Sequence, residues 1–329
     1  MNHTTRRHFI PALLALGAGL PLAARAQHRD EALRIVCGYP PGGSVDIVCR
    51  KLAERLTATG FTAQAIVENR SGAAGRLAVQ EVRRGPADGS VMLVTPASVV
   101  TMYAHIYRPL SYDPFADLAP VSSVAATGFA LAVGPRVPAS VVTVEGFARW
   151  CNANPAAAQC GNAGAGSMPH FMALLMEREL RVAMTHVPYR GGSAAMQSVA
   201  AGDVASALGT ESSARPLAQA GRLRVLATSG ADRSPFFPQV ATFREEGLVR
   251  LTQREWFGAF MPARTPDAVV RGAAEALRAV LQEPDVRAVW ERAGLLVESS
   301  TPVALLAAMR SEYDFWGPLI KASGFTPES

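Results

Sequence analysis

The stretch Tyr39-Pro40-Pro41-Gly42-Gly43-Ser44-Val45-Asp46 joins two segments with different hydrophobic periods. The segment before it, Leu33-Arg34-Ile35-Val36-Cys37, is short, apolar and β-branched, which predicts a buried strand. Between Val45 and Leu56 apolar residues recur at spacings of three and four, which predicts an amphipathic helix. The prolines stiffen the connection, and the glycines let its backbone approach a partner closely.

A strand, a glycine-rich turn and a helix N-terminus together form an anion-binding site. Free N–H groups and the positive end of the helix dipole then point at one place. Ser44 is expected to be the N-cap of this helix. A plain strand-to-helix connection explains the same residues, because glycine-rich turns of this kind are common. Both interpretations stay open on this stretch alone.

Residues 1–26 have the composition of an export signal. Arg6 and Arg7 give a basic start, residues 13–22 are apolar, and Ala24-Arg25-Ala26 fits the cleavage rule, so we expect a mature chain from Gln27. The apolar part is shorter than the ~20 residues of a membrane span. Thr5-Arg6-Arg7-His8-Phe9-Ile10 also resembles a twin-arginine signal, which leaves two export routes open. We expect a soluble periplasmic protein.

The mature chain, residues 27–329, has 303 residues, which predicts two domains. Removing residues 1–26, with three arginines and no acidic residue, lowers the formal charge from +5 to +2. This near balance gives no nucleic-acid footprint. Four cysteines in an exported protein permit two disulfides, Cys151–Cys160 and Cys37–Cys49, with four buried thiols as the alternative.

Strand and helix patterns alternate along the chain, which predicts an α/β fold with parallel-rich sheets covered by helices. We expect one discontinuous domain from residues 27–128 plus 249–329, and a second from residues 129–248. Two strands, 121–125 and 129–133, would form one crossing, and a short helix is expected at 242–246. Ligands of such sheets bind beyond the carboxyl ends of strands, so the turns at 39–44 and 164–167 are expected to face one ligand in an interdomain cleft.

Several catalytic and cofactor motifs fail. The glycine spacing of residues 38–44 is that of a P-loop, but Ser44 stands where the lysine belongs. The glycines at 164–166 lack the third of a dinucleotide fingerprint, and no Gly-x-Ser-x-Gly elbow occurs. The histidines lack metal-ligand spacing, so we expect no metal and no cofactor. Ser167 and His170 leave a Ser/His hydrolase as a remote alternative to a capping pair.

Two polar residues have a structural and a functional interpretation. Asp46 lies in the first turn of the helix, where it either complements the dipole and its neighbours or contacts a ligand amine or hydroxyl. Tyr189 is either a cleft-lining group or a half-buried aromatic at the end of a strand. The cluster Glu68-Asn69-Arg70 is interpreted as an internal ion-pair and turn cluster.

The motifs, taken together and in order, resemble the Bug family of periplasmic solute receptors, the binding proteins of tripartite tricarboxylate transporters. The matching stretches are the opening Tyr39–Asp46 stretch, Glu68-Asn69-Arg70-Ser71-Gly72-Ala73-Ala74-Gly75, Pro86-Ala87-Asp88-Gly89, Ser111-Tyr112-Asp113-Pro114, Gly164-Ala165-Gly166-Ser167-Met168-Pro169-His170, Val187-Pro188-Tyr189-Arg190-Gly191, Gly221-Arg222-Leu223-Arg224-Val225-Leu226-Ala227 and Thr301-Pro302. The resemblance covers essentially the whole mature chain.

This resemblance implies a type II periplasmic-binding-protein fold whose cleft holds a small carboxylate through backbone N–H groups and water. The ligand-binding residues it implies are Tyr39, Gly43, Ser44, Asp46, Ser98, Gly166, Ser167, His170, Tyr189 and Thr210. The sequence departs from the family at Ser71, where proline is usual, and at Ala74, where glycine is usual. Between Asp203 and Glu211 it also lacks the acidic residues that the family leads us to expect near Ala205 and Gly209, so the motifs do not identify the ligand, above all a ligand with an amine.

We therefore expect a solute receptor with no enzymatic activity. Its partners would be a small carboxylate and the membrane subunits of a transporter, with no nucleic acid, and the receptor is expected to be a monomer. The alternative is a receptor that presents its ligand to a membrane sensor kinase.

Overall fold

The computed structural model describes residues 32–189 and 191–327, so the expected export signal lies outside the described residues. The strands are β1 (Leu33–Cys37), β2 (Ala65–Asn69), β3 (Val91–Pro96), β4 (Leu118–Val133), β5 (Gln159–Asn162), β6 (Thr185–Pro188), β7 (Ser206–Thr210), β8 (Arg224–Thr228), β9 (Arg254–Pro262) and β10 (Leu296–Val297). The α-helices are α1 (Ser44–Ala58), α2 (Arg76–Arg83), α3 (Ala97–Thr101), α4 (Tyr103–Ile106), α5 (Val144–Ala153), α6 (Met168–Leu180), α7 (Gly192–Ala201), α8 (Glu211–Gln219), α9 (Asp267–Leu281), α10 (Pro284–Arg292) and α11 (Pro302–Ser323).

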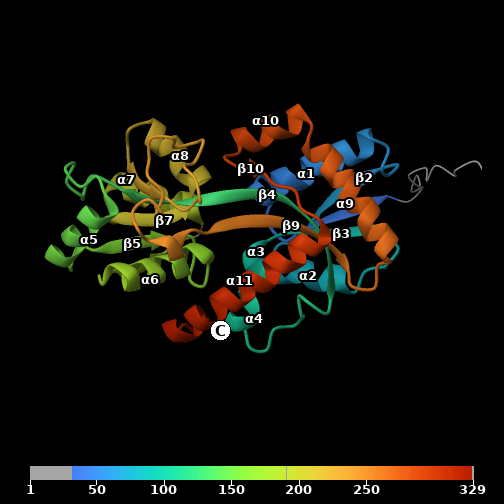
Figure 1. Ribbon diagram of the computed structural model, residues 1–329, viewed down its shortest axis with the longest axis horizontal. Coiled ribbons are helices and arrows are strands. Elements are labelled where there is room, and N and C mark those ends of the chain that lie inside the picture. The colour runs from blue at the N-terminus through green and yellow to red at the C-terminus, as the bar shows by residue number, and fades with distance from the viewer. Residues whose placement is uncertain (1–31, 190, 328–329) are drawn as a thin grey trace, which may run out of the picture.

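One mixed sheet runs through the molecule in the order β2-β1-β3-β9-β4-β7-β5-β6, and β8 and β10 both pair with β4. The long strands β4 and β9 lie along its middle and join the two halves (Figure 1). We call the half with β1–β3 the first lobe and the half with β5–β8 the second lobe. The assignment of residues 27–128 plus 249–329 and of 129–248 to separate domains stays a prediction.

The strand directions make the two lobes face each other. Strand β3 is antiparallel to β9, β9 to β4, and β4 to β7. The carboxyl ends of β1 and β3 therefore point toward the second lobe, and those of β5 and β7 point toward the first. Both sets of strand ends meet along the middle of β4, where open α/β sheets bind their ligands.

Helices cover both faces of the sheet (Figure 1). On one face, buried side chains of α1, α9 and α10 form one core and those of α7 and α8 form another. On the other face, a single apolar core runs under α2, α3, α4, α5, α6 and α11. Trp290 and Trp316, both fully buried, are among the largest side chains of these cores.

Two expectations about elements were wrong, and two helices were not predicted. The crossing expected as two strands is one strand of 16 residues, β4, because Thr127 and Gly128 continue its ladder with β9. The segment 242–246 forms a turn instead of a helix. Helices α3 and α8 were not predicted, and α8 contains Pro216.

All four cysteines are buried free thiols in the structure, so neither Cys37–Cys49 nor Cys151–Cys160 is formed in it. Cys37 ends β1 and Cys49 lies in α1, and the Cys37 thiol donates a hydrogen bond to the Tyr39 carbonyl oxygen at 3.6 Å. Within residues 32–327, apart from residue 190, no helix has the length and apolarity needed to cross a membrane.

Candidate functional site

The turn at residues 39–44 presents an uncapped helix N-terminus. Helix α1 begins at Ser44, and its N-cap is Gly43, which has no side chain to offer. The expectation that Ser44 is the N-cap was therefore wrong by one residue. The N–H groups of the first helical turn have no acceptor within a helix. Those of Ser44 and Val45 are thus free to bind an anion at the positive end of the dipole.

Asp46 holds this turn from inside. Its carboxylate is 1% exposed, and it accepts hydrogen bonds from the Gly42 N–H at 2.9 Å, Arg50 Nε at 2.9 Å and Asn69 Nδ2 at 2.8 Å. Burial alone would raise the pKa of Asp46, but these donors outweigh it and lower the pKa. Since Asn69 Nδ2 also contacts the Tyr39 carbonyl oxygen at 2.9 Å, Asp46 organises the turn in the structure.

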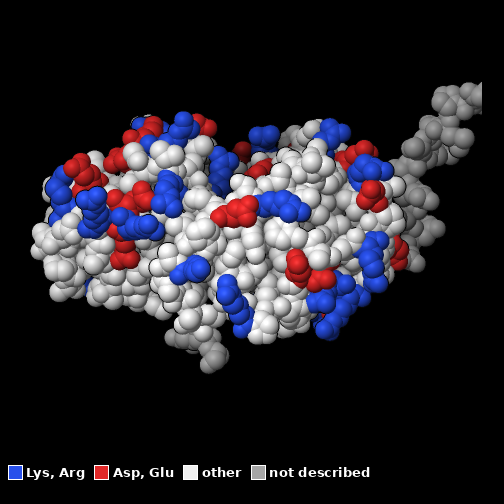
Figure 2. All heavy atoms as spheres, turned by 60° about the horizontal axis from the view of Figure 1, so that its bottom comes forward, with Lys and Arg blue, Asp and Glu red and all other residues white. Residues whose placement is uncertain are grey.

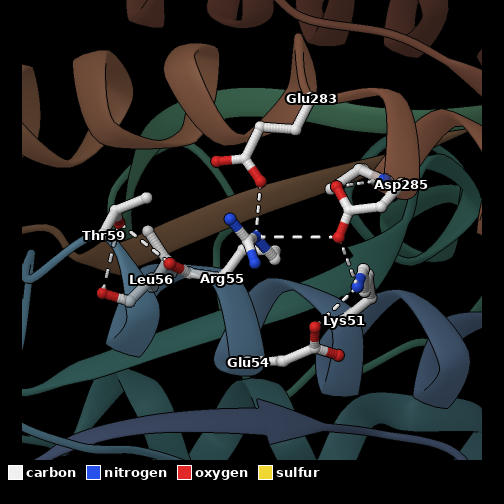
Figure 3. A network of polar contacts seen from close by, with 8 residues as sticks. Lys51, Glu54, Arg55, Leu56, Thr59, Glu283 and Asp285 are labelled. Carbon is white, nitrogen blue, oxygen red and sulfur yellow. Dashed lines mark hydrogen bonds and ion pairs between the residues drawn. The ribbon is translucent and has the colours of Figure 1, made fainter.

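Ion pairs fix α1 to the start of α10 (Figure 3). Lys51 Nζ lies 2.8 Å from Asp285 Oδ2 and 2.6 Å from Glu54 Oε1. Arg55 is paired with Glu283, and its Nε lies 3.8 Å from Asp285. The helix that presents the anion-binding N–H groups is therefore anchored at its far end as well as at its start.

Tyr39 packs beneath the second glycine-rich turn of the first lobe. A Cβ on Gly75 would lie 3.3 Å from the Tyr39 hydroxyl, so only glycine lets the two approach. Burial, with Tyr103 and Glu255 nearby, raises the pKa of Tyr39. In the same turn Ala74 has a φ of +54°, the left-handed region that favours glycine. The departure from the family at Ala74 therefore places a strained residue beside the site.

The opposing turn at 164–167 uses most of its donors internally. The Gly166 N–H donates to His170 Nδ1 at 3.1 Å, and the Gly164 N–H to Asn162 Oδ1 at 3.1 Å. Ser167 is the N-cap of α6, and its hydroxyl donates to the Gly164 carbonyl oxygen at 2.7 Å. Asn162 Nδ2, buried beneath this turn, has no partner among the described residues. The two turns are thus unequal, because the first leaves the N–H groups of Ser44 and Val45 free, whereas the second engages those of Gly164 and Gly166.

Ser167 and His170 do not form a nucleophile–base pair. His170 Nδ1 is occupied by the Gly166 N–H, and the contact to Ser167 Oγ comes from the backbone N–H of His170 at 3.4 Å. Burial lowers the pKa of His170 to about 4, with His186 contributing. The neutral ring therefore acts as an acceptor that fixes Gly166, whose φ is +78°.

The other expected site residues have partners within the protein. The Tyr189 hydroxyl contacts Ser198 Oγ at 2.6 Å, which favours the half-buried aromatic over the cleft-lining group. Thr210 Oγ1 contacts the hydroxyls of Ser212 and Ser213 at 3.0 and 2.8 Å. The Ser98 N–H donates to Glu255 Oε1 at 3.1 Å.

The distance between the opposing strand ends follows from the sheet register. Pro96 ends β3 opposite Phe257, which pairs with Ala125 of β4, and Thr210 ends β7 opposite Phe129. Ala125 and Phe129 are four positions apart along β4, which corresponds to a distance of about 13 Å. This span suits a small ligand held between the strand ends.

Sequence reasoning missed the buried carboxyl groups around this span. Glu211 begins α8, Glu255 lies opposite Thr127, and Glu312 faces β9 from α11. Burial raises the pKa of all three, and that of Glu312 to about 8. No sequence motif marks them, since they meet only through the register of β9 and the packing of α8 and α11.

The described residues contain no group of three or more His, Cys, Asp or Glu side chains that could hold a metal ion. On the face shown in Figure 2, acidic and basic side chains lie interspersed among uncharged ones. That face lacks the single-sign surface that nucleic-acid binding requires.

Comparisons with known proteins show the family of this chain. Residues 48–325 match the model of the tripartite tricarboxylate transporter family receptor, TctC. A UPF0065 protein from the gbd 5' region of Cupriavidus necator is 32% identical over 290 residues, which are 86% of each chain. Rhodopseudomonas palustris Rpa4515, solved with adipate, is 26% identical with a TM-score of 0.79, covering 91% of this chain and 99% of the other.

MatC from R. palustris, solved with bound malate, is 26% identical with a TM-score of 0.75, and the match covers 88% of this chain and 99% of MatC. The family matched and the fold shared with these periplasmic proteins confirm the resemblance drawn from the motifs. The chain belongs to the family of tripartite tricarboxylate transporter receptors, the Bug-type periplasmic binding proteins.

Proposed function

We propose that this protein is an extracytoplasmic solute receptor that binds a small carboxylate and delivers it to the membrane subunits of a tripartite tricarboxylate-type transporter. The observation that carries the proposal is the uncapped start of α1, with free N–H groups at Ser44 and Val45. It lies at the strand ends that face the second lobe. The relatives solved with malate and adipate support a carboxylate as the ligand.

The receptor acts by binding and not by catalysis. His170 Nδ1 is engaged with the Gly166 N–H, the His170 backbone N–H is the group that contacts Ser167 Oγ, and Ser167 caps a helix. The ligand carboxylate replaces water at the N–H groups of α1. Closure then brings the second lobe over it by bending at β4 and β9, the two strands shared by both lobes.

A proline at residue 44 tests this proposal. Proline is well tolerated at the first position of a helix but has no N–H. Gly43, with φ −75° and ψ 165°, already has the extended backbone that a following proline requires. Ser44→Pro thus removes one ligand donor without breaking α1, and Ser44→Ala is the matched control that keeps the N–H.

We expect a panel of small mono- and dicarboxylates to raise the unfolding temperature of the wild-type protein. Isothermal titration of the best ligand should then show at least tenfold weaker binding to Ser44→Pro, the loss of one hydrogen bond to a charged group. Ser44→Ala should bind nearly as the wild type does. The proposal fails if no carboxylate stabilises the wild type, or if Ser44→Pro binds as tightly as Ser44→Ala.

A further inference from the structure

Glu255 lies on the strand that connects the two lobes, between the opposing strand ends. Glu255 pairs with Thr127 of β4. It lies two residues closer to the second lobe than Phe257, the residue of β9 that pairs with Pro96 at the end of β3. From this place its carboxyl group reaches Ser98, and its Oε1 accepts the Ser98 N–H at 3.1 Å. Glu255 therefore belongs to the same edge of the sheet as the carboxylate-binding turn.

The carboxyl group of Glu255 is nine-tenths buried, with 9% of the residue exposed. Its hydrogen bonds come only from Ser98, and no cationic side chain among residues 32–189 and 191–327 forms an ion pair with it. A carboxylate taken out of water without a cation is costly, so such a group keeps its proton or meets a positive charge. The residues that the structure describes supply no such charge at Glu255.

The surroundings of Glu255 favour a positive partner. The ionisable neighbours of Glu255 are acidic groups, since the Glu312 carboxyl lies on the side of α11 and the Tyr39 hydroxyl lies on the side of the carboxylate-binding turn. The start of α1, by contrast, carries the positive end of a helix dipole. The two ends of the site thus have opposite polarity.

We propose that Glu255 determines ligand specificity by accepting a hydrogen bond from an ammonium group at the end of the ligand opposite the carboxylate. The ligand class is then an amino-carboxylate, with its carboxylate on the N–H groups of Ser44 and Val45. This inference rests on the proposed function, because it takes carboxylate binding at α1 as given. Glu255 supplies, from the crossing strand, the acidic group that is missing near Ala205 and Gly209.

A second carboxylate on the ligand would meet like charge at Glu255, so dicarboxylates should bind more weakly than amino-carboxylates of the same chain. Three matched pairs differ only by an ammonium in place of one carboxylate: 3-aminopropanoate and succinate, 4-aminobutanoate and glutarate, and 5-aminopentanoate and adipate. For the pair whose length fits the site, we expect the amino-carboxylate to bind the wild-type protein at least tenfold more tightly by isothermal titration.

Glu255→Gln is the decisive variant, because glutamine keeps an acceptor for the Ser98 N–H but cannot carry charge. It should weaken binding of the amino-carboxylate at least tenfold and leave that of the dicarboxylate unchanged or tighter. Glu245→Gln, at an exposed carboxylate that pairs with Arg233, is the matched control and should leave both affinities unchanged.

The outcomes separate the two proposals. If the wild type binds carboxylates but Glu255→Gln leaves the ratio of the two affinities unchanged, Glu255 does not set specificity and carboxylate binding stands. The same conclusion follows if the wild type prefers the dicarboxylate of every pair. If neither member of any pair binds but another carboxylate of the panel does, this inference fails and the proposed function stands. If no carboxylate binds, both fail.

Discussion

Replacing Glu312 by glutamine should stabilise the protein at alkaline pH. The Glu312 carboxyl accepts Trp256 Nε1–H at 2.5 Å and lies 3.5 Å from Thr101 Oγ1. Burial, reinforced by Glu255 and Glu298, raises its pKa from 4.5 to about 8, although the Trp256 hydrogen bond lowers it. Glutamine has the same shape and keeps an acceptor for Trp256, so the substitution removes mainly the titration.

The size of the effect follows from the raised pKa. Between pH 4.5 and 8 the unfolded chain has lost the Glu312 proton while the native protein keeps it, so stability falls as pH rises. The slope is about 1.4 kcal/mol per pH unit, which sets an upper limit of roughly 5 kcal/mol over this window. Because Glu312 is partly exposed and its surroundings can relax, we expect about 2–4 kcal/mol.

Urea unfolding followed by tryptophan fluorescence, at pH 5, 7 and 9, measures this free energy. Glu312→Gln should match the wild type at pH 5 and exceed it increasingly at pH 7 and 9. Glu245→Gln is the control at a carboxyl group whose pKa is shifted in the opposite direction, because the Thr242 N–H and Arg233 lower the pKa of Glu245. A gain from Glu312→Gln that is the same at all three pH values would refute the reasoning.

Three further substitutions test the three glycine-rich turns at residues 39–44, 72–75 and 164–167. Asp46→Asn should lower the free energy of unfolding by about 2 kcal/mol and weaken carboxylate binding, because an amide nitrogen would face the Gly42 N–H or Asn69. Urea unfolding measures the first effect and ligand titration the second, and unchanged stability would contradict this prediction. The free energy of unfolding of the wild type should fall by about 3 kcal/mol through His170 as pH falls from 6.5 to 4, because the unfolded chain takes up the proton first. His170→Gln should lack this dependence of stability on pH. Ala74→Gly should add about 0.5–1 kcal/mol by relieving the left-handed φ of 54°, and a destabilised variant in calorimetry would argue against that strain.

The parts of the fold that depend on local sequence were predictable. The strand at 33–37 and the start of α1 follow from hydrophobic period and turn residues, and the structure shifts the cap only from Ser44 to Gly43. Even the contact of Asp46 with Arg50 has a local signal, since residues four apart face each other on a helix.

The parts that depend on register were not predictable. Asn69 reaches Asp46 because β2 pairs with β1 so that Asn69 stands opposite Cys37. Glu255 enters the site because β9 returns antiparallel beside β3 and β4. Residues 121–125 and 129–133 were predicted as separate strands, with Thr127 and Gly128 between them. In the structure the Glu211 side chain packs where a Cβ on Gly128 would lie, so this glycine allows close packing within one continuous strand.

A crystal structure of the protein with its best-binding carboxylate tests the central claim most directly. The proposal predicts a ligand carboxylate oxygen within about 2.7–3.2 Å of the backbone nitrogen of Ser44 or Val45, the range of an N–H···O hydrogen bond. A carboxylate bound elsewhere, with both N–H groups facing solvent, would contradict it.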